Sequence, residues 1–381
     1  MDNTNEDSTA AFSPPARLGL AIAQADLGYV RAAIDSGVTE RSLEFLQHAV
    51  LIAFEAHAFC RNQLSLPLPD LAWETTLAEA SRLSGKFFDD KKRDIEQLAN
   101  QLSLLAESSR IAYRDGWRRR LARWLGIYNP DLAVLSVRNT PVATDLTLAF
   151  HAGIQHPGPD NLAVARKVAY SLAAGVGEMV AILDAANTPH HPPAVELDEA
   201  WVWGDGVAWN CYAQAFAAEV PTRYVPLLIV LQNATATATL VTSTDCCDGC
   251  RFAAFKHRLV VAYHVAQSLK KFRNSSNLPA AVGARVEATL SEPAVNNMLN
   301  LRALRNGLVH LGLSDAPPEV FASENPLRTV IKHYASGMEY EEVDAAVRSA
   351  LSFLNAYLTT WLLEPPTGGV GFAGLLRPPA D

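Results

Sequence analysis

One short run of the chain, from Arg302 to His310, collects side chains that could act on a phosphodiester. Arg302, Arg305, Asn306 and His310 stand there among leucines. An imidazole can take and give a proton near neutral pH, and a guanidinium can hold a phosphate through several hydrogen bonds. These groups suit cleavage of RNA without a metal. We expect His310 to be the general acid and base, and Arg305 to stabilise charge in the transition state.

The leucines of this run repeat at helical spacing, so we expect a helix that ends near Gly312, which would supply a left-handed cap. Asn306 and His310 are four residues apart on one face, where the amide could orient the imidazole. Arg305 lies roughly 140° around the helix axis from His310. A long arginine side chain could still reach the edge of a shared groove, and Arg302 would add a second RNA-binding guanidinium.

The pattern Arg305-Asn306, three residues and then His310 resembles the signature of the HEPN superfamily. That signature is an arginine, often followed directly by asparagine, with a histidine a few residues later on a helix. The resemblance implies a compact helical bundle over residues 161–364 that often forms a homodimer. It also implies a metal-independent endoribonuclease or RNA-binding protein of a bacterial defence or toxin-antitoxin system, with RNA and an antitoxin or effector as partners.

A second hypothesis explains the same residues without catalysis. In a helical interaction protein, Arg305 and His310 would form salt bridges and buried hydrogen bonds, and the bundle would present its surface to a partner. The two hypotheses differ in geometry. The enzyme needs both side chains exposed in one positively charged cleft.

A cysteine cluster is the next candidate for chemistry. Cys246, Cys247 and Cys250 precede His257, and three thiolates with one imidazole could bind zinc in a tetrahedron. The spacing is irregular, and adjacent cysteines point in different directions on most backbones. A glycine-containing turn with unligated thiols is the alternative that we favour, so we predict neither a metal nor another cofactor.

A basic patch around Trp117, Arg118, Arg119 and Arg120 could bind RNA, because tryptophan stacks on bases while guanidiniums follow phosphates. The alternative is a solvated end of a helix, where arginines complement the helix dipole and the tryptophan packs inward.

Composition limits the remaining choices. The chain has 381 residues, 49% of them apolar, and a formal net charge of -8, so it can bury a large core and does not attract nucleic acid as a whole. We expect no membrane span, because polar residues interrupt the longest apolar stretch. The acidic N-terminus does not resemble a secretory signal, and five cysteines fit a reducing compartment, so we expect a cytoplasmic protein. The motifs of NTPases, serine hydrolases and dehydrogenases are missing.

Periodicity predicts a mainly α protein. We expect a disordered start at residues 1–15 and an N-terminal helical bundle at residues 16–127. A connecting segment with a short strand or helix should follow at residues 128–160. The HEPN-like bundle at residues 161–364 should carry a small β-hairpin near residues 223–244, where β-branched residues alternate. Residues 365–381, rich in glycine and proline, should form a flexible tail.

Overall fold

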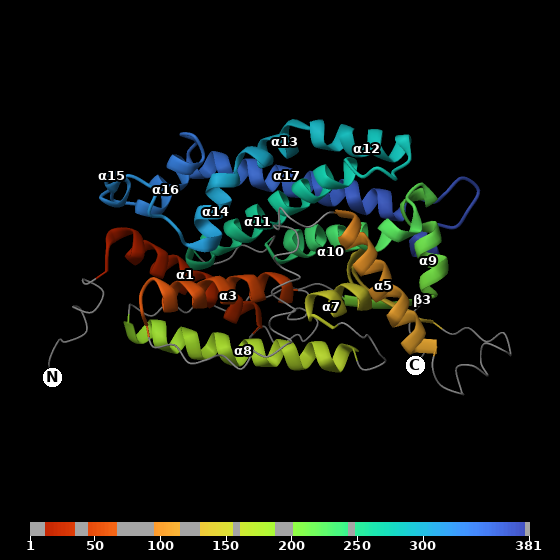
Figure 1. Ribbon diagram of the computed structural model, residues 1–381, viewed down its shortest axis with the longest axis horizontal. Helices are drawn as coiled ribbons and strands as arrows, with labels where there is room; N and C mark the ends of the chain where they lie inside the picture. The colour runs from red at the N-terminus through yellow and green to blue at the C-terminus, as the bar shows by residue number, and fades with distance from the viewer. Residues whose placement is uncertain are drawn as a thin grey trace.

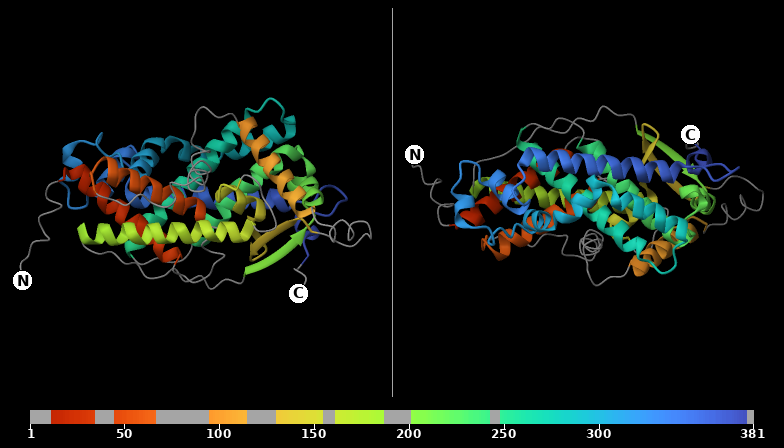
Figure 2. Two further views of the ribbon diagram at one scale, coloured as in Figure 1. Left: turned by 60° about the horizontal axis from the view of Figure 1, so that its bottom comes forward. Right: turned by 90° about the horizontal axis from the view of Figure 1, so that it is seen from above.

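The computed structural model describes residues 12–34, 45–66, 95–114, 130–154, 161–186, 201–242 and 248–377. Helices dominate these ranges, and one small sheet lies at the end of the molecule near the C-terminus (Figure 1, Figure 2). The prediction of a mainly α fold with a small β component is confirmed. Within the described ranges, no helix combines the length and the apolar character needed to cross a membrane.

The longest helices carry most of the core. They are α1 (Pro14–Ile34), α3 (Leu46–Asn62), α5 (Ile95–Arg114), α8 (Asn161–Ala186), α10 (Val225–Val241), α11 (Asp248–Arg273) and α17 (Tyr340–Leu363). The shorter helices are α7 (Asp145–His151), α9 (Ala208–Gln214), α12 (Ala280–Ser291), α13 (Pro293–Asn300), α14 (Arg302–His310), α15 (Pro318–Phe321) and α16 (Pro326–Tyr334). The described ranges also contain the 3-10 turns η3 (Ala215–Ala218), η4 (Thr222–Tyr224) and η5 (Phe372–Leu375).

The N-terminal helices pack directly on the C-terminal ones. Helix α1 contacts α3, α8 and α11, while α11 also contacts α10, α14 and α17. Leu27 of α1, Phe255 of α11 and Val343 of α17 all belong to one continuous cluster of buried apolar side chains. Figure 1 shows α1, α3 and α8 running side by side below α11 and α17. The described parts of residues 16–127 and 161–364 therefore share a core, while the predicted domain boundaries stay a prediction.

The prediction of a β-hairpin near residues 223–244 is wrong, because this segment forms η4 and α10. Helix α10 is buried on nearly its whole circumference. Its polar side chains find carbonyl partners: Thr239 Oγ1 donates to Thr235 O at 2.8 Å, and Gln232 Nε2 donates to Pro141 O at 2.8 Å. Packing between α17, α11 and the sheet outweighs the preference of threonine and valine for strands.

The observed strands lie elsewhere. They are β1 (Leu132–Val137), β2 (Thr140–Thr144) and β3 (Trp201–Gly206), in the antiparallel order β2-β1-β3. Arg138 and Asn139 join β1 to β2 with positive φ angles of 49° and 64°, as a two-residue hairpin turn requires. The short strand or helix expected within residues 128–160 is confirmed, since β1, β2 and α7 all lie there.

The expected cap of α14 needs correction, and part of the C-terminal tail contacts the rest of the protein. Leu311, not Gly312, takes the left-handed conformation after α14, with φ 54°. Leu311 is buried, so its contact with the core fixes the end of the helix. Residues 365–377 of the expected flexible tail also have fixed contacts: Phe372 is fully buried, and the backbone of Arg377 pairs with that of Asp205.

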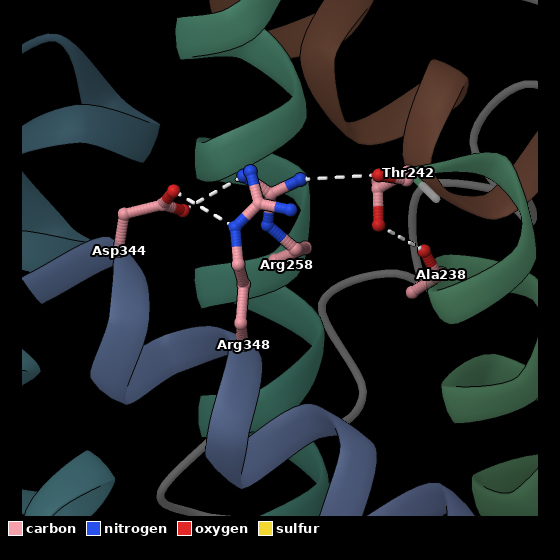
Figure 3. Close-up of polar contacts among 5 residues, drawn as sticks. All are labelled: Ala238, Thr242, Arg258, Asp344 and Arg348. Carbon is pink, nitrogen blue, oxygen red and sulfur yellow. Dashed lines mark hydrogen bonds and ion pairs between the residues drawn. The ribbon is translucent and has the colours of Figure 1, made fainter. Parts of the chain in front are cut away.

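A buried ion pair joins three helices, and we call it the Arg258 clasp: Arg258, Asp344, Arg348 and Thr242 (Figure 3). Arg258 Nη2 on α11 lies 2.7 Å from Asp344 Oδ1 on α17, and Arg348 Nε donates to Asp344 Oδ2 at 2.9 Å. Arg258 Nη1 also reaches Thr242 O, at the C-terminus of α10, at 3.4 Å. A cation stabilises this negative end of a helix dipole, so the clasp fixes α10, α11 and α17 together.

Candidate functional site

The motif helix α14 lies where α3 and α11 meet. Contacts join α14 to both helices, and Leu51 of α3, Val260 of α11 and Val309 of α14 form a small apolar cluster of their own. The polar residues of the candidate site surround this cluster. Its apolar contacts set how α14 is rotated, and so decide which of its side chains reach solvent.

The rotation of α14 divides the motif between two faces. Arg302, Asn306 and His310 are spaced by four residues, so they follow one ridge, with Arg302 and His310 exposed and Asn306 half-buried. Arg305 stands on the opposite side with the buried Leu304 and Leu308. Leu304 and Leu308 pack into the core, and Arg305 is buried because it lies on the same face of the helix.

Arg305 is 1% exposed and its guanidinium is held by protein groups. Nη1 donates to Asn306 Oδ1 at 2.9 Å, and Nη2 donates to His264 Nε2 at 2.5 Å. The guanidinium carbon lies 5.9 Å from the centre of the Tyr263 ring. Since Nε2 of His264 accepts, that ring is neutral and carries its proton on Nδ1. In this conformation Arg305 stabilises the α11–α14 contact and does not meet the predicted need for an exposed phosphate ligand.

His310 is the exposed member of the motif, with 43% of its side chain accessible. Its Nδ1 lies 2.9 Å from Oε2 of Glu55, whose side chain is 10% exposed. The predicted orienting role of Asn306 is not what the structure has, because the amide oxygen of Asn306 serves Arg305. The imidazole is oriented by a carboxylate from α3 instead.

Sequence reasoning missed Glu55, which lies 255 residues before His310 in the chain. Its only local signal is a charged residue within an apolar run, Leu51-Ile-Ala-Phe-Glu55-Ala. A carboxylate on the buried face of a helix needs a partner, but the sequence cannot say which one.

Deeper in the molecule lies a group that we call the histidine layer: His48, His257, Lys256 and Asp26. The rings of His48 and His257 stack with centroids 3.8 Å apart. Burial lowers the pKa of His257 to about 3, helped by Arg258, and burial together with His257, Lys256 and His264 holds the pKa of His48 well below its usual range. Both rings are therefore neutral.

The other two members of the layer form a buried ion pair. Lys256 Nζ on α11 contacts Asp26 Oδ2 on α1, and their side chains are 1% and 3% exposed. Burial raises the pKa of Asp26, while the ammonium of Lys256 acts in the opposite direction. The layer joins α1, α3 and α11, and its four side chains are all buried.

Two predicted sites fall largely outside the described residues. Trp117, Arg118, Arg119 and Arg120 lie there, as do Cys246 and Cys247. Cys250 is buried, and His257 packs on His48 and Phe45. Across the described ranges, no group of three or more histidine, cysteine, aspartate or glutamate side chains could hold a metal ion.

A groove in the structure lies away from the motif. Residues of α1, with Phe252 of α11 and Leu327 of α16, line it, and none of its lining residues comes from α3 or α14. It is mainly apolar and has no charged side chain. The groove therefore adds nothing to the chemistry of His310.

Comparison of the chain with protein-family models, with curated protein sequences and with solved structures gives no match. The resemblance of Arg305, Asn306 and His310 to the HEPN signature consequently rests on these residues alone.

Proposed function

We propose that this chain is a HEPN-like RNA-binding protein that cleaves RNA without a metal, with His310 as its proton-transfer group. The observation that carries the proposal is the exposed imidazole of His310 on the motif helix, hydrogen-bonded to the nearly buried carboxylate of Glu55. A histidine with one nitrogen bound to a carboxylate and the ring open to solvent is the arrangement of a general acid and base.

The proton transfers of the proposed reaction need only RNA and this side chain. Neutral His310 takes the proton of a ribose 2'-hydroxyl while the 2'-oxygen attacks the adjacent phosphorus. The bond from phosphorus to the 5'-oxygen breaks, and the imidazolium returns the proton to that leaving oxygen. The products are a 2',3'-cyclic phosphate and a free 5'-hydroxyl, so the imidazole ends as it began.

The phosphate contact in this proposal belongs to Arg302. It is exposed, follows the same ridge as His310, and forms no ion pair with another described residue. Its Cα lies two turns of helix, about 12 Å, from that of His310, a span that a long arginine side chain and a bound strand can bridge. Arg305 supports the ridge from inside, through Asn306 and His264.

The second candidate is a non-catalytic helical interaction protein, and the burial of Arg305 favours it. Under this alternative His310 and Glu55 form a surface salt bridge that joins α14 to α3. Neither residue would then meet a substrate. The two candidates predict opposite outcomes when His310 is removed.

The test is incubation of purified full-length protein with mixed RNA in EDTA, comparing wild type with His310→Ala. We expect the substitution to lower the cleavage rate by about 100-fold or more. His333→Ala is the matched control, because His333 is also an exposed histidine at a helix end and lies outside the motif. Equal cleavage by wild type and His310→Ala, or none by either, would contradict the enzyme and leave the interaction protein.

The biological setting proposed by the resemblance, a bacterial toxin or defence nuclease, is tested by expression in growing cells. We expect wild type to arrest growth and His310→Ala to be harmless at equal protein level. Growth arrest by both forms would show that toxicity does not depend on this histidine.

A further inference from the structure

Helix α3, from the N-terminal part of the chain, reaches the motif through a single carboxylate. Glu55 Oε2 lies 2.9 Å from Nδ1 of His310, and Glu55 is the only acidic residue within ion-pair distance of that imidazole among the described residues. A carboxylate ion only accepts hydrogen bonds, so the proton of this contact belongs to Nδ1. A neutral imidazole has one N–H, which leaves the lone pair on Nε2.

We propose that Glu55 is a positioning residue that holds His310 in the tautomer with its proton on Nδ1, so that Nε2 is the base that meets the ribose 2'-hydroxyl. The catalytic half of this inference rests on the proposed function. The tautomer itself does not, because the geometry of the two side chains determines it.

The surroundings of Glu55 favour its hydrogen bond to His310. Its Oε1 atom is buried and has no hydrogen-bond partner among the described residues, and no other described basic side chain lies within ion-pair distance of it. A carboxylate removed from water with one partner is energetically costly, and the hydrogen bond to that partner is strengthened by the low local dielectric. Buried, poorly compensated charges of this kind are concentrated at functional sites.

The packing of α3 on α14 fixes both side chains. Leu51 precedes Glu55 by one helical turn, and Val309 precedes His310 directly; these two residues meet with Val260 in one apolar cluster. Neither backbone can shift without opening that cluster. The carboxylate is therefore in place before any substrate binds, as an orienting group must be.

During the reaction Glu55 makes and breaks no covalent bond. Nε2 gains the proton of the 2'-hydroxyl, and the imidazolium then has N–H groups on both nitrogens. Glu55 accepts from Nδ1–H throughout and stabilises the positive charge while it exists. When Nε2 returns the proton to the leaving oxygen, the ring is again in its starting tautomer.

The experiment measures the tautomer directly, by nitrogen-15 NMR of protein labelled in its histidines, in alkaline solution where exposed imidazoles are neutral. We expect His310 of wild type to show the Nδ1–H form. In Glu55→Gln we expect the Nε2–H form, which free histidine favours in water, to become the major species. The exposed His333 serves as an internal control and should give the same spectrum in both proteins.

Kinetics on RNA give the second readout. We expect Glu55→Gln to lower kcat by about 100-fold with little change in KM, since RNA contacts other groups. Glu287→Gln, which alters a half-exposed carboxylate of α12 paired with Arg273, is the matched control and should leave both constants unchanged.

The outcomes separate the two proposals. A tautomer that responds to Glu55→Gln in a protein without nuclease activity would uphold the positioning contact and overturn the proposed function. If cleavage requires His310 but Glu55→Gln leaves the tautomer unchanged, the proposed function is upheld and the positioning role of Glu55 is overturned. If Glu55→Gln does not fold, the wild-type spectrum still decides, because an Nε2–H form there overturns the inference.

Discussion

Consecutive residues of α11 illustrate two ways of burying polar groups. Arg258 points into the Arg258 clasp, where Asp344 accepts from guanidiniums on two helices. Lys256 and His257 point into the histidine layer, where both rings are neutral. Asp26 Oδ1 and His257 Nδ1 have no hydrogen-bond partner there among the described residues. The buried guanidinium of Arg258 stays charged because a carboxylate pairs with it. The buried histidines of the layer are neutral instead, which avoids the cost of an unpaired buried charge.

The strongest test of this difference removes the carboxylate of the clasp. Asp344→Ala leaves Arg258 buried at 3% exposure without its counter-ion, and we expect the free energy of unfolding to fall by about 3–5 kcal/mol. Urea denaturation followed by circular dichroism measures the change. Arg348→Ala is the control, because that side chain is 50% exposed, and it should cost less than about 1 kcal/mol. A similar small loss for both variants would show that the clasp holds no uncompensated charge.

Acid should weaken the histidine layer instead. The pKa of His257 is about 3 in the folded protein and near the ordinary value of 6.5 in the unfolded chain. Between these values the unfolded state binds the extra proton, so this contribution is full above pH 6.5 and is lost as the pH falls toward 3. The loss is about 1.4 kcal/mol per pH unit for each such ring.

The matched variant for this prediction is His257→Phe, which keeps an aromatic ring against His48 but cannot take a proton. We expect its free energy of unfolding to fall less than that of wild type between pH 7 and pH 5, by about 2 kcal/mol. Urea denaturation at a series of pH values measures both slopes. Parallel curves would mean that His257 is not held neutral by burial.

The ion pair of the layer should contribute least. Replacing both partners, as in Asp26→Leu with Lys256→Met, removes two buried charges together, and we expect the free energy of unfolding to change by less than about 1 kcal/mol or to rise. Lys256→Met alone should be less stable than the double variant, because it leaves Asp26 buried without its ammonium. A double variant that is the least stable of the three would assign the pair a large favourable energy.

Much of the helical framework could be predicted from the sequence. The apolar repeats of α8 and α17 are regular over several turns, and Asn325 before Pro326 caps α16 by accepting from the amide of Arg328 at 3.3 Å. The hairpin near residues 223–244 could not be predicted correctly. The strand preference of its threonines and valines was overcome by burial on all sides, which depends on helices distant in the chain.

The candidate site could be predicted in part. Helical geometry already separated Arg305 from His310 by roughly 140°. The prediction still placed both side chains at one groove, whereas the structure buries Arg305 beside Leu304 and Leu308. What the sequence could not supply is the partner of each side chain. His264 and Glu55 lie on other helices, and only the packing of α3 and α11 on α14 brings them to Arg305 and His310.

The burial of α10 also has a consequence for how the chain folds during synthesis. This helix has almost no polar face, and its most extensive contact is with α17, which leaves the ribosome only after α11 to α16 have been made. Until α17 has been made, the apolar surface of α10 that it covers stays exposed. Contacts between residues distant in sequence form slowly, and the apolar surface that stays exposed meanwhile is prone to aggregation. We therefore expect folding to depend on chaperones until α17 is complete.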